Sequence, residues 1–399
     1  MLTVETRFGS PTIRGRSAVR EPFVYRHIGD VDPTQWDSLL GPEDLQLSHR
    51  FIRACQLADV ERASYRFVLI EDTNGLACVA ALSSFDVRLE LLASQRLRTT
   101  VRRMRHWYEN FLRVRVLFCG LPVSFGRPCI RFRQDADRRR CIQALESVIV
   151  ETSREFEVPL VCWKEFDASE AAGVDSLREL GYVRAASLPS SRLAVQWASF
   201  EEYVAKMRSP YRRQIRQAQR VAREAGLTFR TVQNFASCCD EVYGLYEEVM
   251  NRAEFQLERL NLAFFQMLNQ EFPREASIIL AEEHGTPVAA AVLLDSPALC
   301  AFLLAGIKYS RNRVTGAYIN LVTEVVAHAI RRGATALEMG QTSYDIKRRL
   351  GACTTSRCMY LRHRSRPVHE MLRRAGGIVF PTRTYPARRV FRNGACAPS

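Results

Sequence analysis

The sequence lacks a hydrophobic run long enough to cross a membrane. Its longest apolar stretches, residues 288–294 and 298–307, are separated by Asp295, Ser296 and Pro297. Each is much shorter than the ~20 residues of a membrane-spanning helix. The first 30 residues contain several arginines but no apolar segment, so they do not match a secretory signal. We therefore expect a soluble protein of the cytoplasm.

Lysine is also scarce, although the chain is basic. Only four of the 57 lysine and arginine residues are lysine, and the formal net charge is +14. So strong an arginine bias is typical of a genome-wide codon preference rather than of selection for a phosphate-binding face. A positive surface still attracts anions, so nucleotide cofactors, tRNA and acidic lipid headgroups all stay open as partners.

Signatures of metal, nucleotide and serine-hydrolase sites are missing. The 12 cysteines include no CxxC pair and no Cys/His cluster with zinc spacing, so we expect reduced thiols and no metal site. No GxSxG, GxGxxG or P-loop motif is present. His328 lies in a predicted helix and is expected to be a packed or surface residue rather than a base. With 47% hydrophobic and 25% charged residues, the composition excludes a disordered chain.

The chain shows the same order of predicted elements twice. Each half has a β-hairpin, a helix, a short strand, a short helix ending in Leu-Gly and a further strand. The matching segments are residues 65–71, 76–82, 137–157, 159–163 and 176–181 in the first half, and 277–283, 288–294, 316–332, 335–339 and 346–351 in the second. This order predicts an α/β fold with two related domains, each a mixed, twisted sheet flanked by helices. We place the domains at residues 1–192 and 193–364, followed by a basic tail, 365–399, that is at best partly ordered.

The first domain carries an arginine-rich insert at residues 86–115. Its arginines alternate with apolar residues such as Leu97, Val101 and Trp107. The pattern indicates a basic amphipathic helix that contacts an anionic membrane surface. A solvated helix with one packed face is the favoured interpretation, and peripheral membrane contact stays the alternative.

A long basic helix is expected at residues 200–225. Ser199 is its predicted N-cap, Gly226 marks its end, and Pro210 predicts a kink or break within it.

The segment after the second hairpin predicts a donor site. A strand at residues 299–306 is followed by a polar loop at 308–315 and by a helix that begins near Gly316. Unpaired amides in the first turn of that helix, its dipole and nearby arginines would bind a pyrophosphate. The predicted donor-binding residues are Lys308, Arg311, Arg313, Thr315, Gly316 and Ala317.

Two motifs in the second half resemble the GNAT acyltransferase superfamily. One is the stretch 211–216 on the long helix. The other is a strand and glycine followed by Y-x-x-K-x-x-x-G, formed by Tyr344, Lys347 and Gly351. They are similar to the tandem-domain branch, which includes predicted N-acyltransferases and the Fem-type peptidoglycan aminoacyltransferases. The resemblance covers roughly residues 191–364, and it reaches the first half only through the order of elements.

One position departs from the GNAT members that use acetyl-CoA. Their pyrophosphate loop is [R/Q]-x-x-G-x-[G/A], whereas Arg313 and Gly316 are followed here by Tyr318 at the small last position. The departure disfavours acetyl-CoA and is expected of branch members that use another donor.

The resemblance implies transfer of an acyl group to an amine, with backbone amides between two splayed parallel strands as donors to the oxyanion. Those strands would be residues 299–306 and 335–339. Glu338, Tyr344 and Asp345 are candidate proton-transfer groups, although surface or arginine-paired carboxylates fit the sequence equally. The predicted substrate-binding residues are Tyr211, Arg212, Arg213 and Gln341.

Lys347 is expected to pair with donor phosphate or to orient a carboxylate, and a solvated helix position is the alternative. Leu177 occupies the matching position of the first half. The first half is therefore expected to act as a scaffold or acceptor cleft.

We expect an enzyme that moves an acyl group from an acyl-CoA-type co-substrate, with no permanently bound cofactor, to a small-molecule amine or peptide. Within the same chemistry, the alternative is aminoacyl transfer from charged tRNA to a cell-wall precursor or small-molecule amine. A non-catalytic binding module on a GNAT scaffold and a nucleic-acid-binding protein are the alternatives of other classes.

Overall fold

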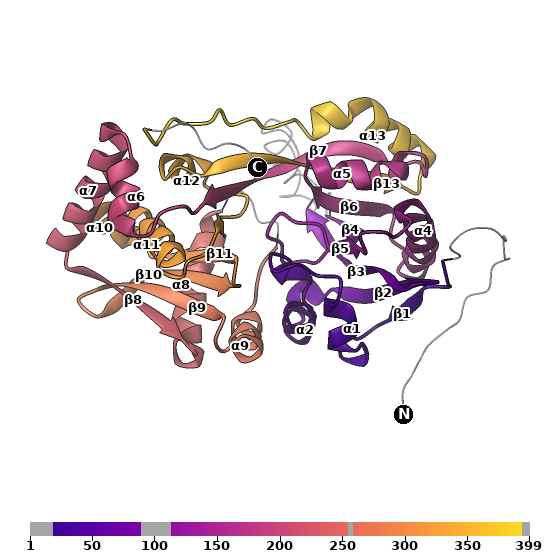
Figure 1. The fold of residues 1–399 in the computed structure, drawn as a ribbon, viewed down its shortest axis with the longest axis horizontal. Coiled ribbons are helices and arrows are strands. Elements are labelled where there is room, and N and C mark those ends of the chain that lie inside the picture. Colours follow the sequence, from indigo (N-terminus) through magenta and orange to yellow (C-terminus); the bar gives the residue numbers. More distant parts are fainter. Residues whose placement is uncertain (1–18, 89–112, 254–257, 393–399) are drawn as a thin grey trace, which may run out of the picture. The chain divides into compact units, whose positions relative to one another are not determined.

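The computed structural model describes residues 19–88, 113–253 and 258–392, which form two compact units (Figure 1). The first unit is Met1–Leu188, Leu257–Leu260 and Ser356–Arg383. The second is Pro189–Gln256, Asn261–Thr355 and Thr384–Ser399. Most of the predicted arginine-rich insert lies outside the described residues. No described helix is both long enough and apolar enough to span a membrane.

A mixed sheet forms the centre of the first unit. Its strand order is β1-β2-β3-β4-β6-β13, with β5 paired to β3. Neighbouring strands are antiparallel except β4 and β6, which are parallel. The strands are β1 (Phe23–Tyr25), β2 (Ser64–Asp72), β3 (Gly75–Arg88), β4 (Arg113–Cys119), β5 (Ile130–Phe132), β6 (Leu160–Phe166) and β13 (Cys353–His363). The predicted hairpin is confirmed, and Gly75 at its turn has a φ of 103°, which favours glycine.

Helices pack on this sheet through apolar residues at helical spacing. The main helix, α4 (Arg138–Glu155), places Cys141, Ile142 and Leu145 in one buried cluster with sheet residues such as Val68 and Trp163. The other α-helices of this unit are α1 (Pro33–Asp37), α2 (His49–Leu57), α5 (Ala168–Val174) and α13 (Arg366–Val379).

The second unit repeats this arrangement. Its strand order is β7-β12-β11-β10-β9-β8, and only β11 and β12 are parallel. The strands are β7 (Val183–Ala194), β8 (Leu227–Gln233), β9 (Ala276–Glu283), β10 (Thr286–Asp295), β11 (Leu299–Ile307) and β12 (Ala336–Glu338). In both units a hairpin, a strand, a helix and a parallel strand follow in that order, as the predicted duplication requires.

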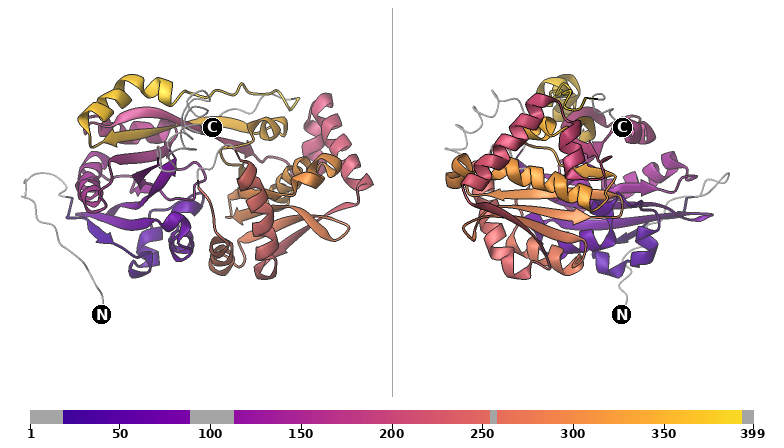
Figure 2. Two further views of the ribbon diagram at one scale, coloured as in Figure 1. Left: turned by 180° about the vertical axis from the view of Figure 1, so that it is seen from behind. Right: turned by 60° about the vertical axis from the view of Figure 1, so that its left-hand side comes forward.

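Helices cover both faces of the second sheet (Figure 2). On one face, α11 packs its buried Leu321, Val325 and Ala329 against Ala289 and Ala291 of β10. Helices α8 and α9 lie on the opposite face. The helices are α6 (Phe200–Lys206), α7 (Ser209–Glu224), α8 (Cys239–Arg252), α9 (Leu262–Glu271), α10 (Tyr309–Thr315), α11 (Ala317–Arg331) and α12 (Tyr344–Arg349).

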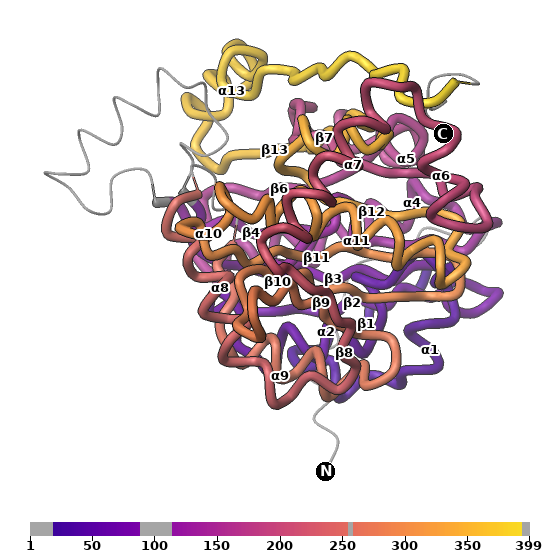
Figure 3. Tube along the Cα trace, turned by 90° about the vertical axis from the view of Figure 1, so that its left-hand side faces the viewer, coloured from indigo at the N-terminus to yellow at the C-terminus, as the bar shows by residue number. Residues whose placement is uncertain are grey.

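The predicted long helix is broken before Pro210, as expected. Helix α6 ends at Lys206, and α7 begins at Ser209 with the proline in its first turn (Figure 3). The predicted N-cap is also confirmed, because Ser199 Oγ accepts a hydrogen bond of 3.1 Å from the amide of Glu202.

Two strands cross from one unit into the other along the chain. β7 begins in the first unit and ends in the second, where Leu193 pairs with Leu337 of β12. β13 begins in the second unit and ends in the first, where Tyr360 pairs with Trp163 of β6. The chain therefore divides differently from the predicted domains, because Ser356–Arg383 belongs to the first unit. Apolar alternation predicts a strand but not its partner.

The basic tail is more regular than expected. It forms α13, whose Leu372 and Val379 pack on a buried cluster of the first unit. The chain then continues to Phe391, which packs against Trp197 and Tyr203 in the second unit.

Candidate functional site

The predicted pair of parallel strands is present in the second unit. β11 pairs with β12 from Leu299 to Ala301, and the last pair joins Ala301 to Glu338. β11 then continues to Ile307 beside β10, whereas the chain after β12 turns toward β7, where Met339 N donates to Ser191 O at 2.8 Å. The two strands therefore separate beyond the Ala301–Glu338 pair, which opens the edge where a carbonyl group could reach backbone amides.

Lys347 and Glu338 lie buried at this point of separation. Their exposed fractions are 3% and 2%. Lys347 Nζ donates to the carbonyl oxygen of Met339, which links α12 to the end of β12. Burial lowers the pKa of Lys347 to about 7, and the Glu338 carboxylate opposes this shift. The alternative of a solvated Lys347 is therefore wrong, and its amine can change charge near neutral pH.

Tyr344 and Asp345 lie at the start of α12 in different settings. Tyr344 donates its hydroxyl to Pro189 O at 2.8 Å, and its ring stacks on Tyr385 with centroids 4.2 Å apart. Asp345 is exposed and forms ion pairs with Arg349 at 2.7 Å and with Arg388 at 2.6 Å. The arginine-paired alternative thus describes Asp345 better than a free base does.

A pocket of about 770 Å³ opens between α7, α11 and α12. It is lined by Gln214, Gln217, Ala218, Tyr318, Ile319, Ser343, Tyr344, Asp345, Ile346, Arg349 and Tyr385. Of the predicted site residues, only Tyr344 and Asp345 are among these. Burial raises the pKa of the Tyr318 hydroxyl, so this tyrosine is a neutral hydrogen-bonding group. The sequence marked Tyr318 only as a departure from a motif, and Tyr385 fell in the expected tail.

At the predicted pyrophosphate-binding site, the protein's own side chains accept hydrogen bonds from the backbone amides. The segment expected as a loop is helix α10, and Gly316, with a φ of 60°, joins it to α11. Thr315 Oγ1 accepts from Ala317 N at 3.2 Å, and Asn312 Oδ1 accepts from Tyr318 N at 2.8 Å. The prediction of unpaired first-turn amides is therefore wrong for these two positions.

The charged residues of this segment are also placed differently from expectation. Arg311 Nε donates to Glu283 Oε2 at 2.7 Å, and this pairing lowers the pKa of Glu283. Lys308 precedes α10, and its amide donates to Val288 O at 2.8 Å. Arg313 is exposed on α10.

Arginines line a groove of about 500 Å³ along α7. Its lining residues are Ser209, Arg212, Arg213, Arg216, Gln217, Arg220 and Arg223. Among the residues that the structure describes, Arg213, Arg216 and Arg223 have no carboxylate within ion-pair distance, whereas Arg220 lies 2.7 Å from Glu224. Gln217 lines both this groove and the 770 Å³ pocket. A positive groove therefore adjoins the pocket.

The remaining predicted substrate-binding residues have structural contacts. Arg212 Nη1 donates to Met207 O at 3.1 Å and so caps the end of α6. Tyr211 is half-buried against the apolar core of the second unit, and Gln341 is buried.

The first unit has an apolar residue where the second has Lys347. Leu177 is fully buried in the cluster around α4. Leu177 therefore belongs to the apolar core of the first unit.

A polar cluster that the sequence did not indicate lies near the end of β6. Lys164 Nζ is 3.9 Å from Glu165 Oε1 and 5.4 Å from the ring centroid of Phe118. Ser124 Oγ donates to the Glu165 carboxylate. Burial raises the pKa of Glu258 to about 7. These residues come from distant segments, so no local motif marks them.

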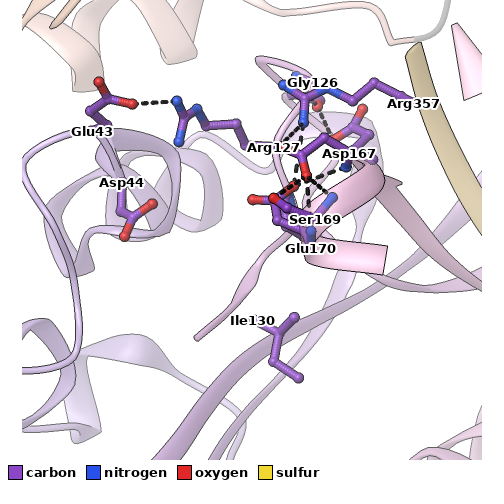
Figure 4. Close-up of polar contacts among 12 residues, drawn as sticks. Glu43, Asp44, Gly126, Arg127, Ile130, Asp167, Ser169, Glu170 and Arg357 are labelled. Atoms are coloured by element: carbon purple, nitrogen blue, oxygen red, sulfur yellow. Dashed lines mark hydrogen bonds and ion pairs between the residues drawn. The ribbon is translucent and has the colours of Figure 1, made fainter. Parts of the chain in front are cut away.

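A second pocket, of about 360 Å³, lies in the first unit. Arg127 Nη2 is 2.5 Å from Glu43 Oε2 in its wall (Figure 4). Glu170 accepts from the amide of Asp167 at 3.0 Å, and Arg357 is 3.3 Å from its carboxylate. The carboxylates that line this pocket are therefore engaged within the protein.

Solved structures share this fold. FemX aligns with a TM-score of 0.56 at 10% identity, over 86% of this chain and 98% of FemX. A tandem GNAT protein from the clavulanic acid biosynthesis pathway aligns with a TM-score of 0.53 at 11% identity, over 86% of this chain and 98% of that protein. The C-terminal domain of a putative lysylphosphatidylglycerol synthetase from Agrobacterium fabrum aligns with a TM-score of 0.51 at 10% identity. The alignment covers 87% of this chain and 96% of that domain. The likeness is one of fold, and the protein has two GNAT-like domains.

The sequence profile of the FemAB-like family, described as peptidoglycan biosynthesis/recognition, matches residues 27–299. No curated protein matches the sequence. The profile and the structural neighbours together support a transferase for an acyl or aminoacyl group. Because the profile spans more than half of the chain, the protein belongs to the FemAB-like family.

Proposed function

We propose that this protein transfers an aminoacyl group from a charged tRNA to the amine of a cell-wall precursor or small molecule. The arginine-lined groove of α7 carries this proposal. Three of its arginines lack carboxylate partners in the described part of the chain, and the groove adjoins the 770 Å³ pocket. Arginine side chains that line one groove suit successive phosphates of a nucleic acid backbone.

The first backbone amides of α11 already donate to side chains, which disfavours an acyl-CoA donor. A diphosphate there would compete with Thr315 and Asn312 for the amides of Ala317 and Tyr318. It would also meet Arg311 already engaged by Glu283. A donor whose phosphates lie along α7 would neither compete for these amides nor need Arg311.

In the proposed reaction, the acceptor amine attacks the ester that joins the aminoacyl group to the ribose of the tRNA. The amine nitrogen bonds to the carbonyl carbon, the bond from that carbon to the ribose oxygen breaks, and one proton passes from the amine to the leaving oxygen. The edge between β11 and β12 would hold the carbonyl group, with backbone amides facing the oxyanion. Lys347 acts as a positioning residue, because its hydrogen bond to Met339 fixes α12 against that edge.

Thermal unfolding with a panel of donors tests the proposal. The panel holds CoA, acetyl-CoA, longer acyl-CoAs, uncharged tRNA and charged tRNA, each at low and moderate salt. A ligand at 100 times its dissociation constant stabilises a protein by about 2.7 kcal/mol. We expect stabilisation by tRNA that weakens steeply with salt, because each phosphate contact adds roughly 0.7–0.9 to the salt slope.

A double variant, Arg213→Gln with Arg216→Gln, should lower the tRNA affinity and the salt slope. The matched control, Arg139→Gln with Arg178→Gln, removes two exposed arginines of the first unit and should leave both unchanged. Stabilisation by acyl-CoA that persists in salt would replace the proposal with an acyl-CoA-dependent transferase. No response to any donor would favour a non-catalytic module on the GNAT scaffold.

A further inference from the structure

Three metal-binding side chains meet beneath the sheet of the second unit, outside the candidate site. Asp295 ends β10 and Cys300 lies directly opposite it on β11. Residues opposite each other on antiparallel strands project on the same face of a sheet. His328 comes from the last turn of α11, which packs on that face.

The donor atoms of these side chains are close together. One ligand atom of each, a carboxylate oxygen, a thiol sulfur and an imidazole nitrogen, lies within 4.8 Å of the other two. His328 Nε2 is 2.9 Å from Asp295 Oδ2. The exposed fractions of Asp295, Cys300 and His328 are 5%, 0% and 7%. In the described parts of the chain, this is the one group of three such residues that could share an ion.

One carboxylate oxygen of Asp295 accepts no hydrogen bond of ordinary geometry from the residues that the structure describes, although the Cys300 thiol lies against the same carboxylate. This oxygen is Oδ1, and it is buried. A buried carboxylate oxygen without a partner costs free energy, and a bound cation would remove that cost. The other oxygen, Oδ2, already has partners, because His328 Nε2 lies 2.9 Å from it and the half-exposed Arg332 places Nε at 3.5 Å.

The donor set selects the class of ion. One nitrogen, one sulfur and one oxygen suit Zn²⁺, which binds such ligands at ~2.0–2.3 Å in tetrahedral geometry. Mg²⁺ and Ca²⁺ prefer oxygen ligands throughout. A thiolate and a carboxylate would balance the two charges of Zn²⁺, and Arg332 would orient the ligating carboxylate from outside.

We propose that Asp295, Cys300 and His328 form a Zn²⁺ site that ties the end of α11 to the β10–β11 hairpin. A water molecule would complete the four-coordinate shell. Binding involves no redox step, and the thiol proton passes to solvent as the metal–sulfur bond forms. No motif marks this site, because its ligands come from three elements and lack a metal-binding spacing.

Metal analysis of the full-length, tag-free protein tests this proposal. The protein is stripped with a chelator, equilibrated with Zn²⁺ and desalted. We expect about one Zn²⁺ per chain and a higher Tm than in the stripped protein. Replacement by Co²⁺ should give a thiolate-to-cobalt absorption band, which reports a sulfur ligand directly.

Cys300→Ser should lose the bound zinc, the cobalt band and the zinc-dependent rise in Tm. Cys78→Ser, which alters an equally buried thiol of the first unit, should retain all three. If Cys300→Ser does not fold, His328→Gln provides the same test without altering the thiol. Failure of the native protein to retain zinc would overturn the proposal, as would equal retention by Cys300→Ser or His328→Gln.

Discussion

Lys347 illustrates how one residue of the candidate site depends on its packing. An amine in water keeps its proton to about pH 10.5, whereas burial lowers the pKa of Lys347 to about 7. The unfolded chain therefore binds more protons than the folded protein between these values. It follows that the contribution of Lys347 makes the free energy of unfolding rise with pH across this window.

Replacing this residue with Lys347→Met should flatten that rise, because the apolar side chain has no proton to lose. Each unit of pKa shift corresponds to about 1.4 kcal/mol, so the difference between the two slopes is measurable. Urea unfolding at pH 7, 8, 9 and 10 checks it. Transfer activity should fall at least about tenfold, because the hydrogen bond to Met339 is lost.

Lys206→Met is the matched control, since Lys206 is exposed at the end of α6. It should keep both the native slope and the native activity. A Lys347→Met slope equal to that of the native protein would show that the amine stays protonated in the folded state.

Residue identities at the site were partly predictable. Lys347 followed from its motif, but its burial depends on Met339 and Glu338, which only the folded chain brings around it. Asp345 was a candidate proton-transfer group, yet the structure pairs it with Arg388 from the tail. Tyr385 could not be predicted, because its stacking partner lies about 40 residues away in the chain.

At the scale of elements, helix α10 shows why the predicted donor loop was wrong. Its seven residues lack an apolar repeat, so the sequence favoured a loop. The helix is held by buried Thr315 and by the pairing of Arg311 with Glu283. The neighbouring strands and α11 were predictable, because their apolar patterns extend over 9 to 15 residues.

Thr315→Ala should destabilise the protein by about 1–2 kcal/mol. The variant removes the oxygen that accepts from the amide of Ala317, and a buried donor without a partner carries a cost of this size. Chemical unfolding measures the change, with Thr342→Ala, at an exposed position after β12, as the control. An unchanged unfolding midpoint for Thr315→Ala would indicate that the amide finds another partner.

At the scale of the whole molecule, each compact unit is built from segments that are separated along the chain. The repeat of elements predicted two domains of similar construction, and the strand order within each of the two units confirms it. The sequence placed the end of the second domain at residue 364 because the tail lacks a regular pattern. The structure assigns Ser356–Arg383 to the first unit, where Tyr360 pairs with Trp163. The first unit thus includes a segment that follows the strands of the second unit in the chain.

The C-terminal helix should therefore stabilise the first unit. Phe380 and Leu372 pack with Phe85 and Leu160 in one buried cluster, whereas Ile378 on the same helix is 76% exposed. Phe380→Ala should cost about 3–5 kcal/mol through lost burial and a new cavity, and Ile378→Ala should change stability by less than ~0.5 kcal/mol. A chain ending at residue 364 should be destabilised more than Phe380→Ala, because it loses the whole helix and also the ring contacts of Tyr385 and Phe391 in the second unit. Thermal and urea unfolding of the four proteins decides this, and native stability of the shortened chain would mean that the first unit folds without its last segment.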